Sequence, residues 1–155
     1  VLAAGGVATG RHVLAALAMG AQGVWMGTAW LTTTEYRIQD ALRQKLLAAG
    51  SDDTVISRAD SGKTLRQIRT AWSDEWAAPG APSPLKMPLQ DILVGDLLGA
   101  IDEHLIEPLM HYPAGQSIGY FNEVRSVSEV MRTIVDEARE GLARLRTPAS
   151  ETESN

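Results

Sequence analysis

The sequence predicts an α/β protein in which strands and helices alternate over the first fifty residues and helices dominate the remaining hundred. Two short apolar runs, residues 1–4 and 23–26, each end on glycine, and a helical pattern lies between them. A strand, a helix and a second strand within so few residues imply parallel strands joined by a crossover helix. We therefore expect βα units over residues 1–50, a mainly helical segment over 51–146 and a disordered polar tail over 147–155.

The first helix is bounded by residues typical of helix ends. Thr9 is suited to cap the N-terminus and Gly20 to follow the C-terminus, so that a helix is expected over residues 10–19. Its inner face would carry Val13, Leu14, Leu17 and Ala18. The apolar run over residues 23–26 is predicted to be a second buried strand.

A second helix is predicted directly after these units. Thr32 and Glu35 have the spacing of a capping box, so that we expect the helix to run from there to Gly50. Its apolar stripe would consist of Ile38, Leu42 and Leu46.

The middle of the chain contains a predicted strand, a predicted helix and a proline-rich connector. A β-type run over residues 54–57 precedes a Ser-Gly turn at 61–62. Apolar residues at Leu65, Ile68 and Trp72 predict a further helix. Four prolines within residues 79–88 then exclude a helix or a central strand, so that we expect an ordered connector or the approach to a lid.

Two long amphipathic helices are predicted beyond the connector, with a glycine-containing loop, HYPAGQSIGY, between them. The first would extend from Leu89 to Leu105, because Pro108 stops it. Its inner face would consist of Leu89, Ile92, Leu93, Leu97, Ile101 and Leu105. The second would begin at a capping box formed by Ser126 and Glu129. Its inner face would consist of Val130, Ile134, Val135, Ala138, Leu142 and Leu145.

Composition excludes several classes of function. The net charge of -5 argues against nucleic-acid binding and against a polybasic membrane surface. The chain has no cysteine, which excludes disulfides and thiolate metal sites and fits a cytoplasmic protein. No apolar stretch reaches the roughly 20 residues needed to span a bilayer. Two strands cannot form a stable parallel sheet, so we expect the rest of the sheet to come from residues outside this chain or from another chain.

The two glycine turns are the part of the sequence that indicates a ligand-binding site. Gly5-Gly6 and Gly27-Thr28 follow two successive strands, and the ends of neighbouring parallel strands meet at one edge of a sheet. Glycine backbone can approach an anion closely, and the positive end of the helix that follows would add to the attraction. In (β/α)₈ barrels the last two strand–helix loops commonly hold a phosphate in this way. We therefore expect both turns to bind one phosphate.

The segment AAGGVATGRHVLAALAMGAQGVWMGTAWL resembles the FMN-phosphate segment of nitronate monooxygenases, also called 2-nitropropane dioxygenases. Three later segments, GKTLRQIRTAWSDEW, PSPLKMPLQ and AGQSIGYFNEVRSVSEVMRTIVDEA, are similar to later parts of longer bacterial members. The resemblance covers nearly the whole chain apart from its tail. It implies the C-terminal part of a (β/α)₈ barrel, comprising the last two strands and helices, followed by a mainly helical segment.

The resemblance also implies a cofactor, a reaction and a set of site residues. An FMN-dependent oxidoreductase would oxidise an alkyl nitronate, and the reduced flavin would react with O2. The residues implied at the FMN are Gly5, Gly6, Trp25, Met26, Gly27, Thr28, Gln116 and Gly119. The family's histidine base belongs to an earlier strand, so we expect no catalytic residue and no metal ligand in this chain. The N-terminal half of the barrel is the expected partner.

Two alternatives remain open. One is a related FMN-dependent barrel enzyme, such as an enoyl reductase, a 2-hydroxy acid oxidase or an inosine-monophosphate-type dehydrogenase. The hydroxy-acid oxidases are disfavoured, because Ala4 and Thr28 stand where they usually have aspartate and arginine. The other alternative is a helical interaction module without catalysis.

Other polar and aromatic residues have simpler interpretations. His12 and His104 are expected on helix surfaces, whereas His111 precedes a Tyr-Pro loop that could approach an active site. No two histidines have metal-ligand spacing. The adjacent carboxylates Asp52-Asp53 and Asp74-Glu75 are expected to cap helices or face water. The pair Trp72 and Trp76 is expected to anchor a helix to the core.

Overall fold

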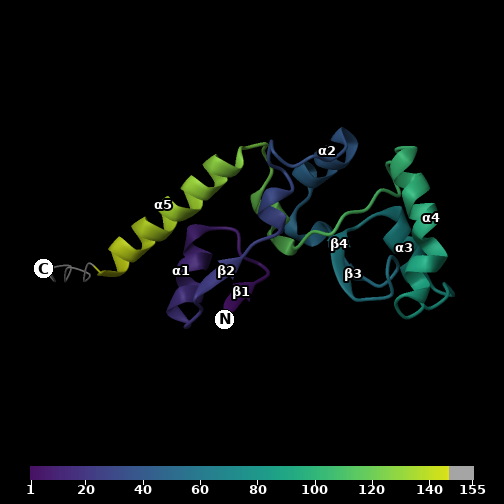
Figure 1. Cartoon of the computed structure of the whole chain (residues 1–155), viewed down its shortest axis with the longest axis horizontal. Coiled ribbons are helices and arrows are strands. Elements are labelled where there is room, and N and C mark those ends of the chain that lie inside the picture. Colours follow the sequence, from purple (N-terminus) through teal and green to yellow (C-terminus); the bar gives the residue numbers. More distant parts are fainter. Residues whose placement is uncertain (147–155) are drawn as a thin grey trace, which may run out of the picture.

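The computed structural model describes residues 1–146 and has an elongated shape (Figure 1). The helices and strands, in chain order, are β1 (Leu2–Ala4), α1 (Gly10–Ala18), β2 (Gly23–Trp25), α2 (Asp40–Ala48), β3 (Thr54–Ser57), β4 (Leu65–Ile68), α3 (Ala71–Ala77), α4 (Leu89–Glu103) and α5 (Val127–Arg146). Short 3₁₀ turns lie at Thr28–Trp30, Ser51–Asp53 and Gln116–Tyr120. None of the helices described has the length and apolarity to cross a membrane. The tail predicted to be disordered, 147–155, lies outside the described residues.

The predicted strand–helix–strand unit is confirmed. β1 and β2 pair in parallel with Ala3 opposite Val24, and α1 crosses between them. The Thr9 hydroxyl accepts a hydrogen bond from the His12 N–H and caps α1, as expected. Gly20 ends the helix with a φ of 94°.

The burial predicted for this unit is wrong in part. Trp25 in β2 is 67% exposed and Leu2 in β1 is 53% exposed, because each strand has only the other as a sheet neighbour within residues 1–146. On α1, Leu17 and Ala18 face solvent, and Ala16 is buried in their place. The sheet is thus a two-stranded fragment, and no closed barrel forms within the described residues.

The capping box predicted at Thr32 and Glu35 is wrong, since α2 begins only at Asp40. The carboxylate of Glu35 instead accepts hydrogen bonds from the Val127 N–H at the start of α5. The guanidinium of Arg43 donates to the carbonyl oxygens of Thr33 and Tyr36, which satisfies the backbone of a non-helical segment. Glu35 therefore contacts a residue far away in the sequence instead of capping the helix that follows it.

The helix predicted from Leu65 is also wrong over its first turn. Residues 65–68 form β4, which pairs antiparallel with β3 at residues 54–57, where the predicted strand is confirmed. On its other side β4 meets residues 112–114, through the Ile68 N–H to Tyr112 carbonyl bond and the Gln67–Pro113 bridge. Helix α3 then begins at Ala71 and carries Trp72. Strand pairing on both sides outweighs the local helical spacing.

Helices α4 and α5 occupy the predicted positions, but α4 packs a different face against the core and buries only Ile101 of the residues predicted for it. On α4 the buried residues are Gln90, Val94 and Ile101. The predicted residues Leu89, Ile92, Leu93, Leu97 and Leu105 are exposed. Gln90 sets the rotation of the helix, because its side-chain amide donates to the Ala59 carbonyl 2.6 Å away. On α5, Val130 and Ile134 are buried as predicted, whereas Val135, Leu142 and Leu145 are exposed.

Within residues 1–146 the hydrophobic core consists of three clusters. The cluster beside the parallel strands contains Ala8, Ala29, Phe121, Val130 and Ile134. The cluster around α3 and α4 contains Leu42, Ala59, Trp72, Val94, Ile101 and Met110, with Trp76 packed against it as predicted. The third lies between them and contains Leu46, Ala49, Ile68, Ala114 and Ile118.

Candidate functional site

The two glycine turns leave the same edge of the parallel sheet. The register places Ala4 opposite Trp25, so that Gly5-Gly6 follows one paired end directly and Gly27 follows the other after Met26. Gly5 and Gly6 have φ angles of 89° and 70°, a conformation that side chains other than glycine rarely adopt. A Cβ atom added to either of them, or to Gly27, would meet nothing within 4 Å. The backbone here is open, which is the shape required for the close approach of an anion.

The amide groups of this edge are available to a ligand. Among the hydrogen bonds of residues 1–146, none uses the N–H of Gly6 or of Gly27. Free glycine amides on adjacent strand ends form an anion-binding concavity. The turns therefore have the open geometry and the donor groups that a phosphate requires.

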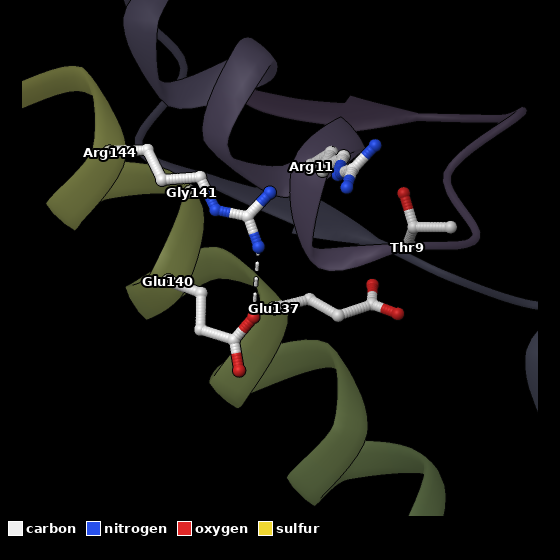
Figure 2. Close-up of a pocket in the computed structure, with 6 residues that line it drawn as sticks. All are labelled: Thr9, Arg11, Glu137, Glu140, Gly141 and Arg144. Carbon is white, nitrogen blue, oxygen red and sulfur yellow. Dashed lines mark hydrogen bonds and ion pairs between the residues drawn. The ribbon is translucent and has the colours of Figure 1, made fainter.

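The start of α1, by contrast, is already occupied by a carboxylate. The Gly10 N–H donates to Oε2 of Glu137 at 2.7 Å, and Figure 2 shows the Glu137 side chain extending from α5 toward Thr9. A hollow of about 210 Å³ lies beside this contact, lined by Thr9, Arg11, Glu137, Glu140, Gly141 and Arg144. The expectation that the helix end adds its positive pole to the phosphate site thus needs correction, because a carboxylate already neutralises that pole.

Thr28 connects the second strand end to the loop that precedes α5. Its Oγ1 accepts a hydrogen bond from the Gly115 N–H at 2.9 Å. As the oxygen is the acceptor, the hydroxyl proton of Thr28 remains free to donate to an anion. A Cβ atom on Gly115 would lie 3.3 Å from the same oxygen, so that the close approach depends on glycine.

The remaining predicted site residues occupy different surroundings. Met26 packs against the cluster of Ala8 and Phe121, and its carbonyl accepts from Nε1 of Trp30. Trp25 lies in β2 and is mostly exposed. Gln116 is exposed at the start of a 3₁₀ turn.

Gly119 serves packing rather than the glycine edge. A Cβ atom there would lie 3.0 Å from the Ser51 N and Oγ atoms, so glycine is required for contact with the 51–53 turn. Within this loop it is Gly115, which the sequence did not single out, that reaches Thr28.

A groove of about 390 Å³ opens beside Thr28 and was not foreseen from the sequence. Its lining consists of Gly27, Thr28, Leu31, Tyr36, Arg66, Tyr112, Pro113, Ala114 and Gly115. Arg66 carries the sole formal charge among them. Tyr36 and Tyr112 come from irregular segments and Arg66 from a strand expected to be helical, so that no periodic pattern marked them.

The hydroxyl groups of Tyr36 and Tyr112 form a hydrogen bond, and their rings meet edge to face with centroids 6.2 Å apart. Burial, followed by this hydrogen bond, raises the pKa of Tyr112 to about 12. Tyr112 therefore stays neutral, and a hydrogen-bond donor, over the whole physiological pH range.

The three histidines lie away from the glycine edge or in structural roles. His12 is half-buried, which corrects its predicted surface role: its Nδ1 accepts from the Ala8 N–H and its ring contacts Tyr120. His104 is exposed as predicted. His111 is half-buried, with its Nε2 3.4 Å from Oδ2 of Asp60. Across residues 1–146, no three histidine, aspartate or glutamate side chains gather as a metal site would require.

The adjacent carboxylates act locally. Asp53 accepts from the Gly50 N–H, and Asp74 pairs with Arg69 at 2.8 Å. Their predicted capping and surface roles are confirmed.

Comparison with models of protein families identifies the family of this chain. The sequence model for nitronate monooxygenase matches residues 1–137. The chain belongs to the nitronate monooxygenase family. A Mycobacterium tuberculosis protein named as a monooxygenase, Rv1533, is 48% identical over 143 residues, which are 88% of this chain and 38% of that protein. The family comprises flavin-dependent oxidoreductases.

Solved structures with a similar fold agree with this placement. A nitroalkane oxidase from Streptomyces ansochromogenes superposes with a TM-score of 0.81 and 26% identity, covering 94% of this chain and 41% of its own. FabK from Thermotoga maritima superposes with a TM-score of 0.73 and 32% identity, covering 94% of this chain and 46% of its own. The chain thus spans less than half the length of each of these relatives.

Proposed function

We propose that this chain forms the FMN-phosphate end of an oxidoreductase that oxidises alkyl nitronates with O2. The observation that carries the proposal is the pair of open glycine turns at one edge of a parallel sheet, with free amide groups on both. A phosphate dianion needs several donors that converge without side chains between them. Gly5, Gly6 and Gly27 would supply backbone N–H groups, and Thr28 its hydroxyl proton.

The other residues implied by the resemblance would act at the margin of this site. Trp25 and Met26 would lead the backbone into the second turn, and Gln116 and Gly119 would belong to the loop that closes over it. β1 and β2 would be the last two strands of a (β/α)₈ barrel. Their exposed side chains, Leu2 and Trp25, would be covered by the earlier strands, from the same or another polypeptide.

FMN, when bound, would supply the two-electron oxidation of the substrate and the reaction with O2. The tasks of this chain would be to hold the phosphate, to orient the flavin through that anchor and to exclude water from the groove beside Thr28. The base that removes a proton from neutral nitroalkanes would lie outside residues 1–155. None of the three histidines of this chain takes that role in the proposal.

A flavin-dependent enoyl reductase is the second candidate, because the solved structures similar to this chain include FabK as well as the nitroalkane oxidase. The two candidates differ in their substrates. Consumption of O2 with propane-2-nitronate would support the first, whereas NAD(P)H oxidation with an enoyl thioester would support the second.

The phosphate assignment is tested by replacing Gly27 with valine in the flavin-loaded protein. The site has no neighbour within 4 Å and an ordinary φ of -109°, so we expect the melting temperature to change little. The valine side chain would block the anion, and flavin absorbance should be lost on gel filtration. Gln22→Val, at the opposite end of β2, is the matched control and should retain flavin. Normal flavin occupancy in Gly27→Val would show that the phosphate binds elsewhere.

A further inference from the structure

Arg66 is the one charged residue of the groove beside Thr28, and within residues 1–146 only one nitrogen of its guanidinium, Nη1, has a hydrogen-bond acceptor. Its Nη1 donates to Oγ1 of Thr54 at 3.0 Å and lies 3.4 Å from the Thr54 carbonyl oxygen. In the described part of the chain no acceptor binds its Nε or Nη2. The guanidinium is half-buried and anchored, and it retains unused donors toward the groove.

The backbone around Arg66 fixes the direction of its side chain. Arg66 lies in β4, opposite Ile56 of β3, and its carbonyl accepts from the Ala114 N–H. Strand pairing on both sides therefore holds the residue in place. A positively charged group in a rigid setting of this kind binds an anion with little loss of conformational entropy.

Two tyrosine hydroxyls stand in the same groove. Tyr36 and Tyr112 bind each other, and each is positioned by its own backbone: the Tyr36 carbonyl accepts from Arg43, and the Tyr112 carbonyl accepts from the Ile68 N–H. One phenol proton lies in the bond between the two oxygens, which leaves the other available to a ligand. The groove thus combines one cation and neutral donors with the apolar side chain of Leu31.

We propose that this groove binds the charged end of a small organic anion with two terminal oxygens, a nitronate or a carboxylate, and that Arg66 determines this specificity. The inference rests on the proposed function, since it places the substrate beside the cofactor. A planar guanidinium matches a planar two-oxygen anion through paired N–H···O bonds. The glycine edge already offers donors for the tetrahedral phosphate, and Arg66 approaches the groove from a different element, β4. Gly27 and Thr28 line the same groove, so the comparison of FMN with riboflavin distinguishes the substrate from the cofactor phosphate as the partner of Arg66.

The test compares Arg66→Met, Arg66→Lys and the matched control Arg69→Met. Arg69 lies three residues along the chain, is exposed and pairs with Asp74, so that its replacement removes the same charge outside the groove. Calorimetric titration of the oxidised flavoprotein would measure the binding of acetate and of isobutyrate, a carboxylate with the same carbon skeleton as propane-2-nitronate that the flavin does not oxidise. A second titration would measure the retention of FMN and of riboflavin, which lacks the phosphate.

We expect Arg66→Met to weaken binding of both anions about tenfold to a hundredfold, with flavin retention unchanged. Arg66→Lys should recover only part of the affinity, because lysine keeps the positive charge but lacks the paired, coplanar N–H donors of arginine. Arg69→Met should bind both anions within twofold of the parent.

Two results would overturn the inference. Equal anion affinity in Arg66→Met and the parent would remove Arg66 from the substrate site. Loss of FMN with normal retention of riboflavin would assign Arg66 to the cofactor phosphate instead. Neither result depends on Gly27→Val, so that failure of the glycine edge and failure of the Arg66 groove are told apart.

Discussion

The two ends of the molecule achieve order by different means. At one end, β1, α1 and β2 are held by α5, and the contact is backbone against backbone: a Cβ atom on Gly10 would overlap the Ile134 carbonyl and the Ala138 nitrogen. At the other end, the β3–β4 hairpin, α3 and α4 are organised around buried polar side chains. Asp60 there accepts from Nε1 of Trp72, and Gln90 from the Leu85 N–H.

At the end formed by β1, α1 and β2, the residues that would bind a ligand are different from the residues that stabilise the fold. The glycine turns bear no packing, because nothing lies within 4 Å of the Cβ positions of Gly5, Gly6 or Gly27. Gly27, whose φ is ordinary, can therefore be changed without loss of the fold, whereas Gly5 and Gly6 have positive φ angles at which a side chain is strained. At the second end the polar side chains are themselves the packing, so that a change in them affects stability first.

The largest expected effect concerns the contact between α1 and α5. Gly10→Ala should cost about 2–3 kcal/mol of unfolding free energy, because α5 must move to admit the methyl group. Gly95→Ala is the matched control, since Gly95 lies within α4 and a Cβ atom there meets nothing within 4 Å. It should instead stabilise the protein by about 0.5–1 kcal/mol. Urea unfolding of both variants measures the difference, and equal effects would contradict the backbone contact.

The next effect concerns the buried carboxylate of the second end. Asp60 is 8% exposed, and its loss would leave Nε1 of Trp72 and the ring of His111 without a partner. We expect Asp60→Ala to cost about 1.5–2 kcal/mol, with a change in tryptophan fluorescence. Asp52→Ala, at an exposed position, should stay within about 0.5 kcal/mol of the parent. A similar loss in both variants would show that Asp60 has no special role.

The smallest effect is a dependence on pH at the start of α5. Hydrogen bonds from Val127 and Thr34 lower the pKa of Glu35, and those from Ser126 lower the pKa of Glu129, both from 4.5. A lowered folded-state pKa gives stability that is present above 4.5 and is lost as pH falls through the lowered values.

Glu35→Gln should therefore lower the melting temperature slightly near neutrality and reduce its dependence on pH below 4.5, so that the variant and the parent converge in acid. Glu140→Gln, which removes an exposed carboxylate farther along α5, is the control. Identical acid profiles for Glu35→Gln and the parent would show that the Val127 contact contributes nothing to stability.

Sequence patterns predicted the elements whose signals are local. Thr9 and the Ser126–Glu129 pair cap the helices as expected, and the parallel pairing of β1 with β2 followed from the short strand–helix–strand spacing. The same patterns failed where a distant partner intervened. Glu35 caps α5 instead of its own helix, and residues 65–68 pair with β3 instead of forming a helical turn.

By itself the sequence determined the helix boundaries set by capping residues and the two glycine turns, because hydroxyl caps and positive φ angles depend on a few neighbouring atoms. The tertiary structure alone decided which face of α4 is buried, that Gly115 contacts Thr28, and that Arg66 lies with Tyr36 and Tyr112 in one groove. These features depend on contacts between residues far apart in the chain, and no periodicity within a single element encodes such contacts.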